Sequence, residues 1–129
     1  MDFADFIKAK RMDKGYSLRG FADKVEIAPA YLSDIEKRKR NAPTSEILDR
    51  MVNVLGLQEE ERNEMLDLAA KGKNELAEDI TDYVGSNESV RVALRKAKEL
   101  NLSETEWFKI IKEMEKKKNW VNGFIAKKN

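Results

Sequence analysis

Residues 17–41 decide the fold of this chain, and their sequence is SLRGFADKVEIAPAYLSDIEKRKRN. Ser17 can cap a short helix whose apolar residues recur at helical spacing, namely Leu18, Phe21, Ala22 and Val25. Pro29 suits the first position of a second helix, because its missing N–H is not needed there. We therefore predict helices over about 18–25 and 29–37, joined by a tight turn.

Four consecutive cations, Lys37, Arg38, Lys39 and Arg40, follow the second of these helices and precede Asn41. Such a run is either a solvated face or a phosphate-binding loop. The formal net charge of +1 conceals how charge is distributed along the chain. Residues 1–57 carry 11 basic and 9 acidic side chains, residues 58–82 carry 3 and 9, and residues 83–129 carry 11 and 6. An acidic middle therefore separates two mildly basic ends.

Outside this segment, apolar residues at helical spacing predict further helices and no pattern predicts a strand. We expect five helices in residues 1–72, with Gly15 and Gly56 ending the first and the fourth. Residues 73–86 are polar and mostly acidic, so we interpret them as a linker. Two more helices are predicted within 87–118, the second beginning with a capping box of Ser103 and Glu106. Residues 119–129 are interpreted as a tail.

The composition excludes several classes of protein. The chain has no cysteine and no histidine, which excludes disulfide frameworks, zinc fingers and Cys or His nucleophiles. No apolar run approaches the ~18 residues that a membrane span needs, and the N-terminus lacks a signal-peptide layout. The Gly15–Gly20 spacing superficially resembles a phosphate loop but is not followed by Lys and Ser/Thr. We predict a cytoplasmic protein that is not an enzyme, with no catalytic residue, metal, cofactor or membrane partner.

The outer face of the helix predicted over 29–37 consists of small and polar side chains, from Pro29, Ala30, Ser33, Asp34 and Lys37. A helix with such a face can enter the major groove of double-stranded DNA and approach the base edges. The preceding helix would lie across the DNA backbone, where Ser17, Arg19 and the free N–H groups of its first turn suit a phosphate. This layout is typical of a helix-turn-helix.

The stretches SLRGFADKV (17–25), APAYLSDIEK (28–37) and RNAPT (40–44) resemble the phage-repressor and Cro-like (XRE-type) DNA-binding domain. The resemblance covers about residues 3–57 and extends toward residue 72. It implies an all-α fold: a five-helix repressor-like DNA-binding domain over 1–72, followed by a C-terminal two-helix module over 87–118.

The resemblance also implies roles for matching residues. Arg11 and Glu36 would form a partly buried ion pair that fixes the reading helix. The base-facing positions would be Pro29, Ala30, Ser33 and Asp34, and the loop that touches the DNA backbone would comprise Lys37, Arg38, Lys39, Arg40 and Asn41. Tyr31 either contacts a phosphate or a thymine methyl, or packs at the domain edge.

Three residues depart from the family pattern. Glu26 occupies a turn position where the family often has glycine, which predicts a positive φ at a cost of roughly 1 kcal/mol. Arg38 stands where a glycine often ends the reading helix. Asp34 is an acid in a base-facing position, where it can accept a hydrogen bond from cytosine N4.

Family members pair as two-fold dimers, with reading helices ~34 Å apart on successive major grooves. We therefore interpret 87–118 as a dimerisation or partner module whose surface comprises Trp107, Ile110, Ile111 and Met114. The alternative is that these apolar faces pack on the preceding helix.

The resemblance implies a sequence-specific transcriptional regulator, a repressor that binds double-stranded DNA as a homodimer. Short relatives of this type are often encoded by mobile elements, and some meet a protein antagonist, a metallopeptidase. The alternative function is a protein-interaction module, such as an antitoxin or a metallopeptidase partner, that acts through residues 73–129.

Overall fold

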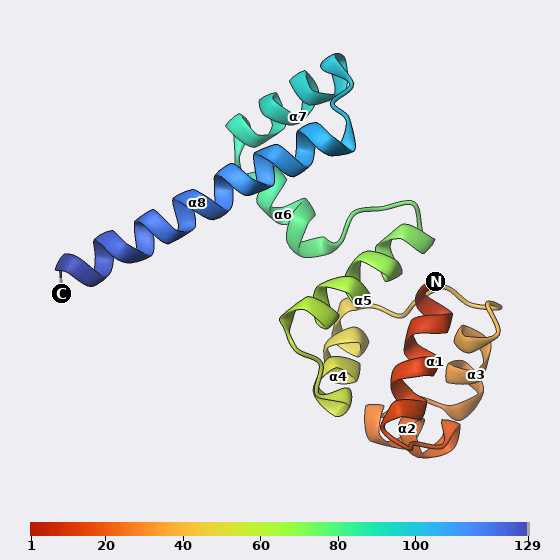
Figure 1. Cartoon of the computed structure of the whole chain (residues 1–129). Coiled ribbons are helices and arrows are strands. Elements are labelled where there is room, and N and C mark those ends of the chain that lie inside the picture. Colours follow the sequence, from red (N-terminus) through yellow and green to blue (C-terminus); the bar gives the residue numbers. More distant parts are fainter. Residues whose placement is uncertain (129) are drawn as a thin grey trace. The chain divides into compact units, whose positions relative to one another are not determined.

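The computed structural model describes the backbone of residues 1–128 and the side chains of residues 1–118. The described backbone contains eight helices and no strand, which confirms the predicted all-α class (Figure 1). The helices are α1 (Phe3–Asp13), α2 (Leu18–Val25), α3 (Pro29–Glu36), α4 (Ser45–Leu55), α5 (Glu59–Gly72), α6 (Glu78–Ser86), α7 (Glu88–Leu100) and α8 (Glu104–Lys128). The chain divides into two compact units, one from Met1 to Tyr83 and one from Val84 onward.

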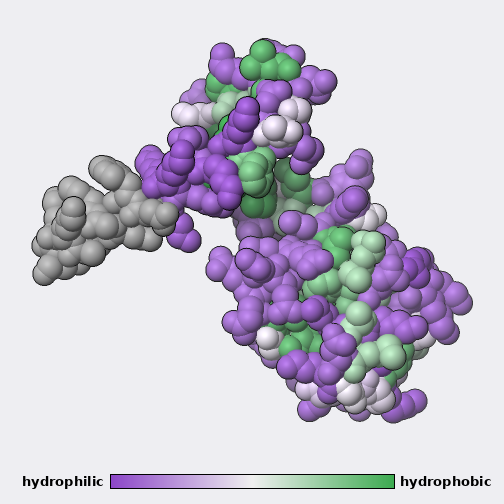
Figure 2. All heavy atoms as spheres, viewed as in Figure 1, coloured by the Kyte–Doolittle hydropathy of each residue, from purple (hydrophilic) through white to green (hydrophobic). Residues whose placement is uncertain are grey.

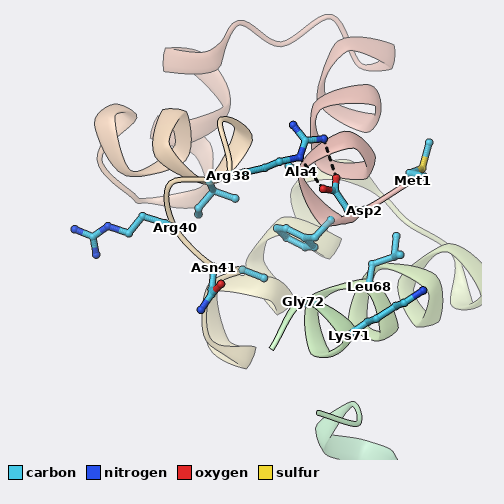
Figure 3. Close-up of a pocket in the computed structure, with 13 residues that line it drawn as sticks. Met1, Asp2, Ala4, Arg38, Arg40, Asn41, Leu68, Lys71 and Gly72 are labelled. Carbon is cyan, nitrogen blue, oxygen red and sulfur yellow. Dashed lines mark hydrogen bonds and ion pairs between the residues drawn. The ribbon is translucent and has the colours of Figure 1, made fainter. Parts of the chain in front are cut away.

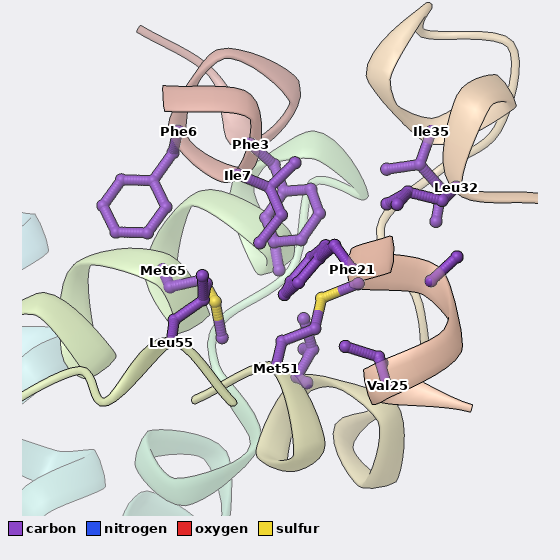
Figure 4. Packing of buried hydrophobic residues seen from close by; sticks show 13 residues of the cluster. Phe3, Phe6, Ile7, Phe21, Val25, Leu32, Ile35, Met51, Leu55 and Met65 are labelled. Atoms are coloured by element: carbon purple, nitrogen blue, oxygen red, sulfur yellow. The ribbon is translucent and has the colours of Figure 1, made fainter. Parts of the chain in front are cut away.

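One hydrophobic core holds α1 to α5 together in the first unit (Figure 4). All five helices contribute side chains that are at most 1% exposed: Ile7, Phe21, Ala22, Val25, Leu32, Met51, Leu55 and Met65. Burying an aliphatic or aromatic side chain of this size contributes ~1.5–3 kcal/mol. The core anchors α3 through Leu32 and Ile35, so the opposite face of this helix is turned outward.

A residue with positive φ follows each of α1 to α5 and α7. The N–H of this residue and the N–H of the residue after it both bond back to carbonyls of the last turn. These residues are Gly15, Glu26, Arg38, Gly56, Asn74 and Asn101. At the end of α3, Arg38 N–H donates to the Ile35 carbonyl (3.1 Å) and Lys39 N–H to the Asp34 carbonyl (2.8 Å), which is a Schellman motif. The motif satisfies carbonyl groups that the end of a helix leaves without partners.

Two of these positive-φ positions carry long charged side chains. Glu26 has φ 64° and Arg38 has φ 63°, so both adopt the left-handed conformation that glycine would adopt without strain. The positive φ predicted for Glu26 is therefore present. The Glu26 carboxylate accepts a hydrogen bond from Arg50 Nη1 of α4 (3.3 Å), which connects the turn between α2 and α3 to α4.

The structure differs from the sequence analysis in two segments. Residues 78–86, interpreted as part of a linker, form α6, because Ile80, Tyr83 and Val84 recur at helical spacing and Glu78 and Asp79 occupy the first turn. The last helix, predicted to end near residue 118, continues to Lys128, so residues 119–128 of the predicted tail are helical. The side chains of residues 119–129 lie outside the described part of the chain. The domain boundaries themselves stay a prediction.

The second unit consists of α7, α8 and the last residues of α6, and hydrogen bonds cap the ends of these helices. Arg91 Nη1 donates to the carbonyls of Val84 (2.9 Å) and Gly85 (2.6 Å), which closes the end of α6. The Glu106 N–H donates to Ser103 Oγ (3.2 Å) at the start of α8, as the capping box predicts. Among the described helices, none combines the length and apolar character that a membrane span requires.

Candidate nucleic-acid interface

The outward face of α3 is small and accessible. Ala30 is exposed, and Pro29, Ser33 and Asp34 are partly exposed, whereas Leu32 on the opposite face is fully buried. No large apolar side chain interrupts the four predicted base-facing positions. Small side chains let the backbone of a helix lie close to base edges, and Ser33 and Asp34 can form hydrogen bonds with those edges.

Arg11 and Glu36 fix α3 against α1. Arg11 Nε and Nη2 each donate to one oxygen of the Glu36 carboxylate at 2.9 Å, a bidentate ion pair. The Arg11 side chain is 11% exposed and the Glu36 side chain 6%. Arg11 Nη1 also donates to the Tyr16 carbonyl (2.9 Å) in the turn before α2. The pair is therefore part of the architecture behind the interface, as the resemblance implies.

Ser17 and Arg19 lie at the start of α2. Ser17 is the N-cap, and its Oγ accepts a hydrogen bond from Gly20 N–H (2.9 Å). The hydroxyl proton remains able to donate to a phosphate oxygen. A Cβ on Gly20 would lie 2.9 Å from Ser17 Oγ, so glycine at this position leaves room for the cap. Arg19 is exposed one residue after the start of α2.

The loop after α3 carries the exposed cations Lys37, Lys39 and Arg40, followed by the exposed Asn41. The Arg40 guanidinium lies 5.8 Å from the centre of the Tyr31 ring, at cation–π distance. Tyr31 is partly buried and packs against the edge of the core. The Tyr31 ring thus lies at the domain edge beside Arg40, so this part of the loop lies beside α3, and the contact of Tyr31 with DNA stays a prediction.

Arg38 has a different environment from its neighbours. Its Nε donates to Asp2 Oδ2 (2.7 Å), and its Nη2 donates to Asp2 Oδ1 (3.1 Å) and to Asp5 Oδ1 (2.6 Å). The hydrogen bonds from Arg38 and from the Asp5 N–H lower the pKa of Asp2 to about 2. Figure 3 shows the Arg38 side chain directed at Asp2 and the Arg40 side chain extending away from both. The phosphate contact predicted for Arg38 stays a prediction.

Sequence reasoning missed Asp2 and Asp5 as partners of this loop. Their spacing contained a local signal, since Asp2 is the N-cap of α1 and forms a capping box with Asp5. Nothing in the sequence pairs these two carboxylates with Arg38, which lies 36 residues from Asp2.

The second unit exposes apolar side chains on both of its long helices (Figure 2). Of the predicted partner surface, Ile111 is 47% exposed and Met114 63%, and Trp107 and Ile110 are partly buried. Further exposed apolar residues are Val92, Leu94, Leu100 and Phe108. Ala97 is the only buried residue among the described side chains from Val84 to Lys118. Within its described part, this unit therefore buries little apolar surface of its own.

A family model described as helix-turn-helix matches residues 7–62, which run from within α1 to the start of α5 and include the interface described above. Residues 7–62 therefore form a domain similar to those of the XRE-type helix-turn-helix family. This match confirms the resemblance seen in the sequence.

The HTH-type transcriptional regulator SinR from Bacillus subtilis (strain 168) is 41% identical over 49 residues, which are 38% of this chain and 44% of SinR. SinR from Bacillus licheniformis has the same identity and coverage. This chain thus spans less than half the length of the curated relatives that it matches.

Two solved structures are also similar. The N-terminal DNA binding domain of SinR from Bacillus subtilis is 36% identical, with 43% of this chain and 81% of that chain covered and a TM-score of 0.41. A SinR protein/SinI protein complex contains a chain that is 23% identical, with 91% of this chain and 98% of that chain covered and a TM-score of 0.48.

Proposed function

We propose that this chain is a sequence-specific transcriptional regulator that binds double-stranded DNA through α3 and acts as a repressor. The observation that carries the proposal is the outward face of α3, which is small and polar and lies beside the exposed cations of the following loop. The match of residues 7–62 to the helix-turn-helix family model supports the same function. We propose no catalytic role, metal or cofactor for it.

Each group of interface residues has its own role in this proposal. Ser33 and Asp34 form hydrogen bonds with base edges, Asp34 as an acceptor from cytosine N4, while Pro29 and Ala30 allow close approach. The phosphate-contacting residues are Ser17, Arg19, Tyr31, Lys37, Lys39, Arg40 and Asn41. These contacts hold the register of α3 on the duplex, and the base contacts supply the sequence preference.

Selection of bound sequences from a random duplex pool tests the proposal. The expected result is an enriched motif that changes when Ser33 or Asp34 is substituted. R40A should instead weaken binding on every sequence and reduce the slope of log K against log salt by about 0.9. K14A is a charge-matched control, because it also removes one cation. The Lys14 ammonium lies beside Gly56 at the end of α4, and Lys14 is not one of the proposed DNA-contacting residues. A pool from which nothing is enriched would contradict the proposal.

We further propose that the chain binds as a homodimer through residues 87–118. A single reading helix makes few base contacts, and two copies on a two-fold operator double them. The apolar side chains exposed on α7 and α8 support this assignment, because soluble monomers rarely expose such sets. A two-fold symmetric motif in the selected sequences is the expected result.

The same exposed set favours a second candidate function, a protein-interaction module acting through residues 73–129, such as an antitoxin or the partner of a protein antagonist. The two functions predict different behaviour of the full chain. A regulator retains duplex DNA by itself, whereas an interaction module binds a protein partner and retains no duplex at low salt.

A further inference from the structure

The guanidinium of Arg38 joins the loop after α3 to the start of α1. Three hydrogen bonds of 2.6–3.1 Å connect it to the carboxylates of Asp2 and Asp5. Asp2 receives two of them from different nitrogen atoms, which is the bidentate geometry in which an arginine is most strongly oriented. We refer to Asp2, Asp5 and Arg38 as the N-terminal clamp.

Both acceptors of the clamp are themselves held in place. Asp2 Oδ1 accepts a hydrogen bond from Asp5 N–H (3.0 Å), and Asp5 Oδ2 accepts one from Asp2 N–H (3.3 Å). This reciprocal capping box fixes the two carboxylates on the first turn of α1. The Arg38 side chain is therefore attached to a rigid helix end.

The backbone of Arg38 is fixed as well. Arg38 is the positive-φ residue of the Schellman motif that ends α3, and Lys39 N–H and Arg40 N–H both bond to the Asp34 carbonyl (2.8 and 3.3 Å). Glycine would adopt this left-handed conformation without strain, whereas a residue with a Cβ lowers the stability of the fold by ~1–2 kcal/mol here. An arginine at this position adds an anchor that glycine lacks.

Charge also separates Arg38 from the other cations of the loop. Two carboxylates bond to one guanidinium, whose side chain is 54% exposed, so the N-terminal clamp carries a net charge of about −1. This negative charge opposes the approach of a phosphate to Arg38. Lys39 is exposed beside it, and the Arg40 guanidinium lies 5.8 Å from the centre of the Tyr31 ring.

We propose that Arg38 is a positioning residue: through Asp2 and Asp5 it holds the Lys37–Asn41 loop in its place beside α3, and it makes no phosphate contact itself. The inference rests on the proposed DNA-binding function and assigns Asp2 and Asp5 to the same interface.

The first experiment measures how binding of the full chain to a fluorescein-labelled mixed-sequence duplex depends on salt. R38G keeps a residue suited to positive φ and removes the guanidinium, and K39A is the matched loss of a free cation. R38G should weaken binding about threefold with an unchanged salt slope, whereas K39A should reduce the slope by about 0.9. A slope reduced equally by R38G would overturn the proposal, because Arg38 would then neutralise a phosphate.

The second experiment requires no DNA. Backbone ¹⁵N relaxation should show lower order parameters at residues 37–41 in R38G and in the double variant D2N/D5N, in which asparagine can still cap α1. Combining all three substitutions should lower them no further than R38G alone. If residues 37–41 of R38G and of D2N/D5N kept the order parameters of the unsubstituted chain, the positioning role proposed for Arg38 would be overturned. If no duplex is bound at all, the proposed function fails while this readout still decides the clamp.

Discussion

Arg11 lies between Glu36 and the Tyr16 carbonyl and bonds to both. Its guanidinium donates three hydrogen bonds, each 2.9 Å long: two to the carboxylate oxygens of Glu36 and one to the Tyr16 carbonyl. One side chain thereby joins α1, the turn before α2 and the end of α3. The orientation of the base-facing surface depends on this junction, although neither charge faces outward.

Replacing Arg11 with methionine should lower the free energy of unfolding by about 3 kcal/mol, because it leaves the nearly buried Glu36 carboxylate without its partner. Urea denaturation of the full chain, followed by circular dichroism, measures the change. R19M removes an exposed arginine and should alter stability by less than ~0.5 kcal/mol. Equal stabilities of R11M and R19M would contradict the role assigned to the pair.

The substitution E26G should raise the free energy of unfolding by about 1 kcal/mol, since glycine adopts the φ of 64° without a Cβ clash. It also removes the exposed hydrogen bond to Arg50, whose contribution is small at this exposure. E26A separates the two effects, because it loses the Arg50 contact and keeps the strained conformation. Thermal or urea denaturation should therefore rank E26G above the unsubstituted chain and E26A at or below it.

Local signals made most of the fold predictable. The caps and ends at Ser17, Pro29, Gly56 and Asn101 act within one helix turn, so the residue types alone indicate where helices begin and end. The positive φ at Glu26 was expected from the family resemblance, because the family often has glycine at this turn position. The start of α6 was obscured because its acidic first turn resembles a polar linker.

The environment of Arg38 was not predictable in this way. The sequence analysis identifies Arg38 as a departure from the glycine that often ends this helix, but it assigns all four cations of the run the same phosphate-contacting role. Their difference depends on where the start of α1 lies relative to the end of α3, and only the packed core determines this distance. Arg38 and Arg40 are two residues apart, yet one faces two carboxylates and the other an aromatic ring.

The pKa of Asp2 offers a direct measurement of the N-terminal clamp. The hydrogen bond from Arg38 is the largest cause that lowers this pKa from 3.8 to about 2. Because the folded pKa is depressed, the contribution to stability is complete above about pH 4 and is lost as the pH falls toward 2. Carboxyl ¹³C NMR should record this value in the full chain, and R38G should return it toward 3.8. An unchanged Asp2 pKa in R38G would mean that Arg38 does not hold this carboxylate in solution.

The apolar surface of α8 provides the test of dimerisation. Ile111 is 47% exposed and Met114 63%, and both belong to the surface of α8 through which we propose that the chain dimerises. The double substitution I111S/M114S should shift the sedimentation-equilibrium mass of the full chain from the dimer toward the monomer of 14.9 kDa. Binding to a two-fold operator should weaken at the same time, because two half-sites are then bound independently. K116S changes a 74%-exposed side chain on the same helix and should leave both the mass and the affinity unaltered. If I111S/M114S keeps the mass and affinity of the unsubstituted chain, α8 is not the dimer surface.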